Sequence, residues 1–184
     1  SNLNLKNMDN FEKALEKLLG NEGLYSNDPK DSGGETVFGI SRNNFPKLTL
    51  WTFVDALKTR TDFPECIGWD KQILDMVNNF YRENFWNPIQ GDKILNQEKA
   101  FCLFDFAVNS GVSQAVQIVQ RALGVADDGI MGFNTLNGLN NANLEEFIAK
   151  CKIEKIKIYI KIVDRKPDQL KFLKGWIKRT LEMN

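Results

Sequence analysis

The stretch "LLGNEGLYSNDPKDSGGETVFGIS", residues 18–41, follows an apolar segment near the start of a chain whose other segments look helical. It gathers carboxylates, glycines and a proline in a segment longer than the roughly four to six residues of an ordinary connection. Such a stretch is either an awkward connection or an active site. The remainder of the sequence has to decide between the two.

Apolar residues recur at helical spacing on both sides of this stretch. Asp9 can cap a first helix in which Phe11, Leu15 and Leu18 share one face. The strand-like segment is Thr36–Ile40, after a Gly-Gly pair. Further helices are expected to start near Thr49, Trp69 (to about Trp86), Asn96, Ser113 and Asn143. We therefore expect a mainly α fold with a small β-hairpin or short strand after the first helix.

The segment 87–97, "NPIQGDKILNQ", is the best candidate boundary between two helical regions. We expect regions 1–95 and 96–184 to pack closely, because the connection is short. No apolar run is long enough to cross a bilayer, so membrane insertion is not expected.

The 184 residues contain 24 Lys or Arg, 24 Asp or Glu and no histidine. Without histidine, Ser-His-Asp and Cys-His catalysis and most zinc sites are excluded, so hydrolytic chemistry would rest on carboxylates. The balanced charge argues against a nucleic-acid partner but leaves a local patch open. Cys66, Cys102 and Cys151 are too few and too far apart for a disulfide framework, and the last two are expected in the core.

Glu22 is the candidate general acid. If the first helix continues past Leu18, the carboxyl of Glu22 lies at the end of the apolar face, where partial desolvation raises its pKa. A raised pKa keeps a proton available near neutral pH. The alternative is a solvent-facing glutamate at the helix end, with Gly23 as the cap.

A second catalytic group can come from the loop and strand that follow. Glycosidases pair an acid with a group that positions water or stabilises positive charge, and Asp28, Asp31 and Thr36 are candidates. Asp28 also fits a turn before Pro29, and Glu35 is expected to be exposed beside the glycine pair. The ligand pattern of a calcium loop is missing, so no metal is expected.

The same stretch resembles the signature of glycoside hydrolase family 108, which reads E-G-G-Y, N-D-P and D-x-G-G-x-T-x-x-G-I-S/T. Leu24 departs from it, at a position where glycine is usual. The later segments "FDFAVNSG", "VQRALGV", "DDGIMGFNT" and "FLKGWIKR" look like the predicted peptidoglycan-binding region of that family. The matching positions are Glu22, Gly23, Tyr25, Asn27, Asp28, Pro29, Asp31, Gly33, Gly34, Thr36, Gly39, Ile40 and Ser41.

This resemblance implies a lysozyme-like N-acetylmuramidase that needs no cofactor and acts as a monomer on peptidoglycan glycan strands. Glu22 would protonate the glycosidic oxygen of the β-1,4 bond between N-acetylmuramic acid and N-acetylglucosamine. Asp31, or in second place Asp28, would support the water or the positive charge, and Thr36 would orient the water. The residues expected to line the saccharide groove are Tyr25, Asp28, Ser41 and Asn109.

The alternative function is a peptidoglycan-binding module that has lost hydrolytic activity, with Leu24 as the feature that favours it. Asp127-Asp128-Gly129 is expected to form a turn, although it could contact a stem peptide. No signal peptide is seen in this sequence, so we expect synthesis in a bacterial cytoplasm and action at the wall or periplasm after export or holin release. The residues Trp51, Trp69, Trp86 and Trp176 are expected to be core residues and not a sugar platform.

Overall fold

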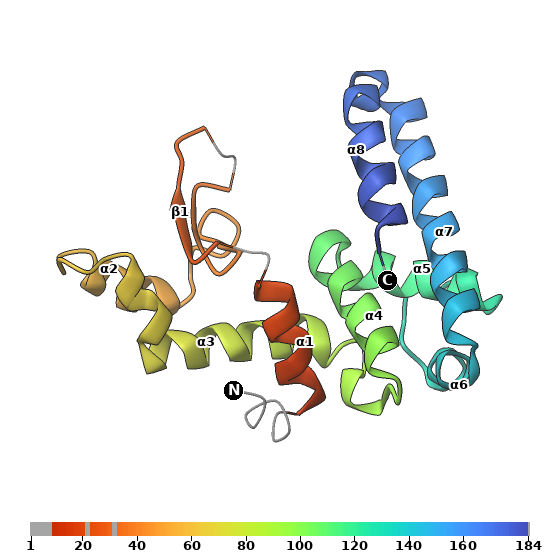
Figure 1. The fold of residues 1–184 in the computed structure, drawn as a ribbon, viewed down its shortest axis with the longest axis horizontal. Helices are drawn as coiled ribbons and strands as arrows, with labels where there is room; N and C mark the ends of the chain where they lie inside the picture. Colours follow the sequence, from red (N-terminus) through yellow and green to blue (C-terminus); the bar gives the residue numbers. More distant parts are fainter. Residues whose placement is uncertain (1–8, 21–22, 31–32, 184) are drawn as a thin grey trace. The chain divides into compact units, whose positions relative to one another are not determined.

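The structure, a computed structural model, describes residues 9–20, 23–30 and 33–183. The chain divides into two compact units, Ser1–Asn84 and Phe85–Asn184. Helices dominate both units, and a small sheet follows the first helix (Figure 1). The mainly α, lysozyme-like fold is thereby confirmed, whereas the expected domain division at residues 95/96 stays a prediction.

Helix α1 (Asn10–Leu19) begins where the sequence indicates. The Asp9 carboxylate accepts a hydrogen bond from the Glu12 amide at 2.7 Å, and the Glu12 carboxylate accepts one from the Asp9 amide at 3.1 Å. This reciprocal pair is a capping box, which satisfies backbone donors left open at a helix start. The helix ends at Leu19, with Gly20 as its C-cap.

Three short antiparallel strands form the sheet in the order β1 (Tyr25–Asn27), β2 (Glu35–Val37) and β3 (Ile40–Ser41). The expected single strand over Thr36–Ile40 is wrong, because the chain reverses at Phe38 and Gly39. Their φ angles of 46° and 77° are both positive, as a tight two-residue turn between strands requires.

Phe38 is held in this unusual conformation by two hydrogen bonds. Its amide donates to the Leu24 carbonyl at 3.0 Å, and its carbonyl accepts from the Tyr81 hydroxyl at 2.6 Å. Both partners lie outside the turn, so tertiary contacts stabilise a backbone geometry that phenylalanine seldom adopts.

The remaining elements of the first unit are α2 (Leu50–Leu57), the 3₁₀ helix η2 (Glu65–Trp69) and α3 (Lys71–Tyr81); the π turn η3 (Arg82–Trp86) follows. Asp70 caps α3 by accepting from the Ile73 amide at 2.9 Å. The helix therefore starts later than expected. Trp69 precedes the cap and is 63% exposed, so its expected place in the core is wrong.

The second unit is built around α4, whose start is capped by the Asn96 side chain. Its buried residues include Leu103, Phe104 and Ala107, and α5 packs against it. The elements are η4 (Gly91–Lys93), α4 (Gln97–Ser110), α5 (Val112–Leu123), α6 (Phe133–Asn141), α7 (Leu144–Arg165), η5 (Pro167–Gln169) and α8 (Leu170–Leu181).

A buried lysine joins α4 to the end of α6. The Lys99 ammonium donates to the carbonyls of Leu139 at 2.7 Å and Ala142 at 2.5 Å. Burial lowers the pKa of Lys99, since desolvation disfavours the charged form. The carbonyls at the C-terminal end of a helix are suitable partners for a cation.

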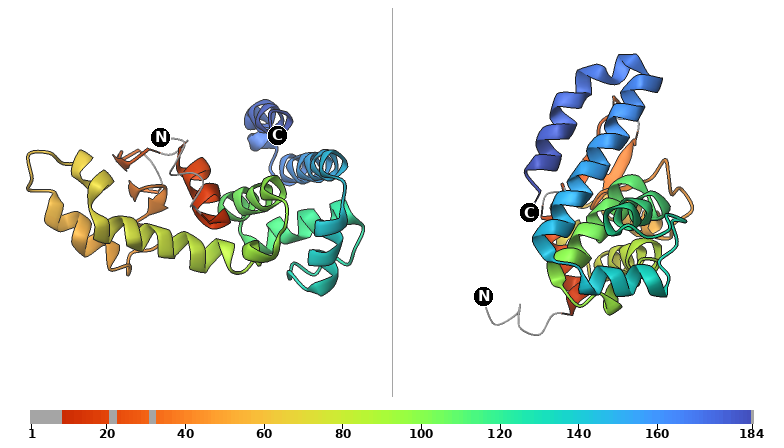
Figure 2. Two further views of the ribbon diagram at one scale, coloured as in Figure 1. Left: turned by 60° about the horizontal axis from the view of Figure 1, so that its bottom comes forward. Right: turned by 90° about the vertical axis from the view of Figure 1, so that its right-hand side faces the viewer.

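Helices α7 and α8 run side by side as a hairpin (Figures 1 and 2). The buried residues of α7 are Phe147, Ile148 and Cys151, all in its first half. Cys102 and Cys151 are both buried, as expected, and the interaction of the Cys151 thiol with Cys102, together with burial, raises the pKa of Cys151. Among the described residues, no helix is long and apolar enough to span a bilayer.

Candidate active site

The two carboxylates expected to carry the chemistry, Glu22 and Asp31, lie outside the described residues. Helix α1 ends at Leu19, with Gly20 as its C-cap. The role of Glu22 as the general acid stays a prediction, which the motif supports.

Thr36 lies at the centre of the sheet. Its register partners are Ser26 on β1 and Ser41 on β3, and residues directly opposite one another project to the same face. The neighbours of Thr36 in β2, Glu35 and Val37, are buried on the other face. In the part of the chain that the structure describes, the Thr36 hydroxyl has no hydrogen-bond partner, so it can bind water or a sugar hydroxyl.

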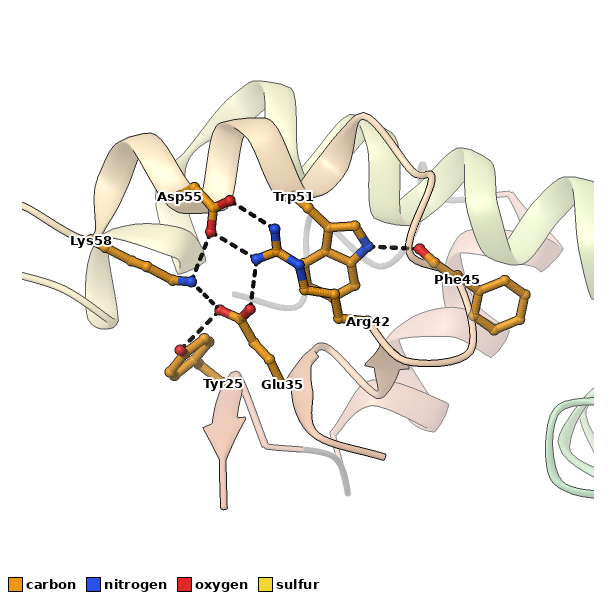
Figure 3. Close-up of polar contacts among 7 residues, drawn as sticks. All are labelled: Tyr25, Glu35, Arg42, Phe45, Trp51, Asp55 and Lys58. Carbon is orange, nitrogen blue, oxygen red and sulfur yellow. Dashed lines mark hydrogen bonds and ion pairs between the residues drawn. The ribbon is translucent and has the colours of Figure 1, made fainter. Parts of the chain in front are cut away.

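Glu35 lies at the centre of an ion network between the sheet and α2 (Figure 3). Its carboxylate is 2.8 Å from the Arg42 guanidinium and 2.7 Å from the Lys58 ammonium. Tyr25 donates its hydroxyl to the same carboxylate at 3.0 Å. Asp55 completes the network, because it accepts two hydrogen bonds of 2.8 Å from Arg42 and pairs with Lys58 at 2.7 Å.

The network tethers the sheet to α2. Arg42 directly follows β3, whereas Asp55 belongs to α2 and Lys58 is its C-cap. The Arg42 guanidinium also lies 5.3 Å from the ring centroid of Trp51, and the Trp51 indole N–H donates to the Phe45 carbonyl at 2.7 Å (Figure 3). Trp51 is buried, as expected.

Glu35 is only 9% exposed, so its expected exposure is wrong. Burial alone would raise the pKa of Glu35, but hydrogen bonds from Lys58, Arg42 and Tyr25 outweigh it and lower the pKa. An ionised carboxylate that accepts three donors cannot act as a general acid. Strand alternation could have found this side chain, since an inward Val37 places Glu35 on the same face.

Three of the expected saccharide ligands make contacts within the first unit. Tyr25 donates to Glu35 and packs edge-on against Phe63, with ring centroids 4.8 Å apart. Ser41 is buried; its hydroxyl donates to the Gly33 carbonyl at 2.7 Å and accepts from the Asn44 amide at 3.3 Å. Through these contacts both residues stabilise the first unit. Their contact with sugar stays a prediction.

Asp28, the third of these ligands, forms a turn. Its carboxylate accepts from the Lys30 amide at 2.9 Å, two residues on, as the Asn-Asp-Pro sequence indicates. The side chain is exposed, so this hydrogen bond leaves carboxylate oxygen available to a ligand.

Asn109 belongs to the second unit, on α4. Its side-chain amide donates to the backbone carbonyl and the carboxylate of Asp105 at 2.9 and 3.1 Å, which confirms that the two residues share a helix face. Its role as a sugar ligand stays a prediction. Over the described ranges there is no group of three or more Cys, Asp or Glu that could hold a metal ion.

Comparison with known families identifies both halves of the chain. Residues 15–111 match the profile described as glycosyl hydrolase 108. The chain belongs to glycoside hydrolase family 108. Residues 114–181 match a second profile, described as a predicted peptidoglycan domain. Together the two matches identify, at the level of the family, a glycoside hydrolase that acts on peptidoglycan of the cell wall.

A solved structure supports this family assignment over almost the whole chain. The solved structure described as "Structure of Brucella abortus SagA" is 28% identical in sequence; the match covers 94% of this chain and 90% of that one, with a TM-score of 0.63. The search of curated proteins found no match.

Proposed function

We propose that this family 108 protein is an N-acetylmuramidase, which hydrolyses the β-1,4 bond between N-acetylmuramic acid and N-acetylglucosamine. The observation that carries the proposal is the family match over residues 15–111, which includes the whole Glu22–Ser41 motif. The peptidoglycan domain at residues 114–181 supports the same substrate.

Glu22 is the proposed general acid. Glycosidic cleavage needs a group that donates a proton to the leaving oxygen. The carboxylates of the described network cannot supply it, because hydrogen bonds from cations lower the pKa of both Glu35 and Asp55. Glu22 lies in the signature and is the residue that matches the acid of the family.

Asp31 and Thr36 are proposed to position the water or to stabilise the developing positive charge. The open hydroxyl of Thr36 on the sheet face supports its part. Asp28 is the second choice, since its carboxylate already accepts the Lys30 amide in a turn. The ion network of Glu35 would hold β2 in place, and with it the backbone that presents Thr36.

Leu24, which favoured the inactive alternative, lies close to η2. A Cβ at Gly68 would lie 3.7 and 3.8 Å from the two methyl carbons of Leu24, and the Leu24 carbonyl accepts from Phe38. The Leu24 side chain therefore lies beside Gly68 of η2, just before β1, and leucine at this position removes no catalytic group.

The test is digestion of purified peptidoglycan by the wild type, Glu22→Gln and Glu16→Gln. Glu16 is an exposed glutamate on α1 and serves as the matched control. We expect reduced muramic acid ends from the wild type and Glu16→Gln, and a loss of about 10²–10⁴-fold in rate for Glu22→Gln. Products are reduced and identified by mass spectrometry.

Each other outcome contradicts a part of the proposal. Reduced glucosamine ends would mean that the enzyme cleaves the other glycosidic bond. Binding to peptidoglycan without any release of reducing ends from the wild type would support the inactive binding module. In the proposal the enzyme works as a monomer and reaches the wall by export or after holin release.

A further inference from the structure

A concave groove lies on the second unit between α4, α5 and α7. Its volume is about 420 Å³, within the roughly 300–1,000 Å³ of small-molecule sites. Its floor contains the buried Phe106 and Ile118, and polar side chains line its walls. The polar residues that matter here are Asn109, Ser110, Gln114, Lys155 and Tyr159.

Several of these polar groups are available to a ligand. Within the described part of the chain, neither the side-chain amide of Gln114 nor the hydroxyl of Tyr159 has a hydrogen-bond partner. The Ser110 hydroxyl donates to the Phe106 carbonyl at 2.7 Å, which leaves its oxygen free to accept. Amides and hydroxyls over an apolar floor suit a sugar ring that carries an N-acetyl group.

Aromatic rings on α8 lie next to Tyr159, a residue that lines the groove. The ring centroids of Tyr159 and Trp176 are 5.3 Å apart, and those of Trp176 and Phe172 are 6.1 Å apart in a stacked arrangement. Phe172 is 46% exposed. The expectation that Trp176 serves the core is thus met only in part, because it packs within a cluster that remains open to solvent on the hairpin.

Charge favours an anionic ligand at the same place. Residues 150–179 contain 11 Lys or Arg and only 3 Asp or Glu, although the whole chain has 24 of each. The Lys155 ammonium lies 4.4 Å from the ring centroid of Phe106, and among the described residues no carboxylate pairs with it. Free carboxylates of the wall's stem peptides are its natural counterparts.

We propose that this groove, together with Trp176 and Phe172, is a second peptidoglycan site that holds substrate without taking part in bond cleavage. An N-acetylated sugar lies against Tyr159 and Gln114, and Lys155 pairs with a carboxylate of the attached stem peptide. The inference rests on the proposed function, since it assigns ligand chemistry and residues to the substrate binding expected of the second unit.

A membrane rich in anionic lipid is the competing partner for a cationic hairpin with exposed apolar residues. The concave shape and the open amide and hydroxyl groups favour the saccharide, because a bilayer surface offers nothing that would use them. The test therefore also measures binding to anionic lipid vesicles.

The test measures co-sedimentation of the full chain with purified sacculi from which lipid and teichoic acid have been removed. All variants carry Glu22→Gln, so that the sacculi are not digested. Lys155→Ala and Tyr159→Ala change the groove, and Lys161→Ala is the matched control, because Lys161 is exposed on the same helix outside the groove. Thermal melting of each variant shows that it folds.

We expect Lys155→Ala and Tyr159→Ala each to weaken binding by about tenfold, with Lys161→Ala within about twofold of the parent. Tetra-N-acetylchitotetraose, as a soluble probe without stem peptide, should lose affinity with Tyr159→Ala but not with Lys155→Ala. Equal effects of all three variants on sacculi overturn the inference, because general charge or stability would then explain binding. A membrane result would also overturn the inference. In that outcome the parent binds phosphatidylglycerol vesicles and the groove variants bind them less, whereas binding to sacculi is unchanged in those variants.

The inference and the proposed function fail separately. Reducing ends released by the Glu22-intact chain, together with groove variants that bind normally, would leave the muramidase standing and remove the second site. Groove-dependent binding without any release of reducing ends would support the second site and remove the muramidase.

Discussion

In each unit a buried polar side chain with several partners holds an irregular segment, and these two side chains, Glu35 and Gln120, differ in charge. In the first unit Glu35 accepts from Arg42, Lys58 and Tyr25 and so ties the sheet to α2. In the second, Gln120 is 1% exposed and holds the loop between α5 and α6. The Gln120 amide donates to Asp128, Ile130 and Thr135 at 2.8–3.1 Å and accepts from the Gly129 amide at 2.9 Å.

This difference in charge predicts how the stability of each segment responds to pH and salt. An ionised carboxylate with cationic partners depends directly on pH and salt, whereas the neutral amide depends on pH only through Asp128, the one ionisable group among its four hydrogen-bond partners. Glu35 belongs to β2, the strand that carries the expected catalytic Thr36, whereas Gln120 holds the Asp127-Asp128-Gly129 turn. That turn is confirmed, with Asp128 accepting from the Ile130 amide at 2.9 Å and Gly129 at a φ of 76°.

Removal of the Glu35 carboxylate should have the largest effect on stability. Glu35→Ala leaves Arg42 and Lys58 with Asp55 alone, and we expect a loss of about 2–4 kcal/mol in the free energy of unfolding of the first unit. The partners are about one third exposed, which keeps the loss below that of a fully buried pair. Denaturant melts with segment-resolved hydrogen exchange over residues 25–58 measure it.

The control for this change is Asp75→Ala. Asp75 pairs with Lys71 on the surface of α3, where both side chains are well exposed. Its loss should cost at most about 0.5 kcal/mol. Equal losses for the two variants would mean that the Glu35 network is no more than a surface ion pair.

Removal of the Gln120 amide should have a smaller effect on stability, confined to the second unit. Gln120→Leu fills similar space but leaves the Gly129 amide and the Thr135 hydroxyl without this partner, which costs about 1–3 kcal/mol. Hydrogen exchange over residues 125–135 should become faster. Gln117→Leu is the matched control, since Gln117 contacts the same loop by one bond of 3.3 Å. An unchanged loop in Gln120→Leu would refute the assigned role.

The smallest expected effect is a change in stability with pH, which should distinguish Glu35 from Gln120. The folded pKa of Glu35 is below its ordinary value of 4.5, so the unfolded chain binds more protons between the two values and stability rises with pH there. The contribution of Glu35 is thus complete above about pH 4.5 and declines as the pH falls through the lowered pKa. The stability difference between wild type and Glu35→Gln should shrink from pH 6 to pH 3, in thermal melts at constant ionic strength.

The same titration on Gln120→Leu supplies the contrast. Its difference from wild type should shrink less over this range, because Asp128 is the only ionisable group among the four hydrogen-bond partners of Gln120, and the Ile130 amide contributes more than Gln120 to the lowered pKa of Asp128. Differences that shrink equally in both variants would point to general acid destabilisation and not to Glu35.

The helices were predictable because their signals are local. Asp9, Asn96 and Asn143 each cap the helix that the apolar spacing predicts, and each cap is present in the structure. Burial of Cys102 and Cys151 followed from the same spacing. The motif with Glu22 and Thr36 identified the family without any structure, since its residue types and intervals are specific.

Three features could not be read from nearby residues. The turn at Phe38 needs Tyr81 and Leu24 to hold a positive φ, and burial of Glu35 needs Arg42 and Lys58 to neutralise it. The groove on the second unit exists only where three helices meet.

The sequence by itself determined the helical framework, the family and the residue types of the hydrolytic motif, because capping, apolar periodicity and motif spacing act over a few positions. Only the tertiary structure decided that Glu35 is a buried, ionised anchor and not a surface residue, and that Trp69 lies in solvent. The physical reason is that the cost of burying a charge depends on partners that folding brings from elsewhere in the chain.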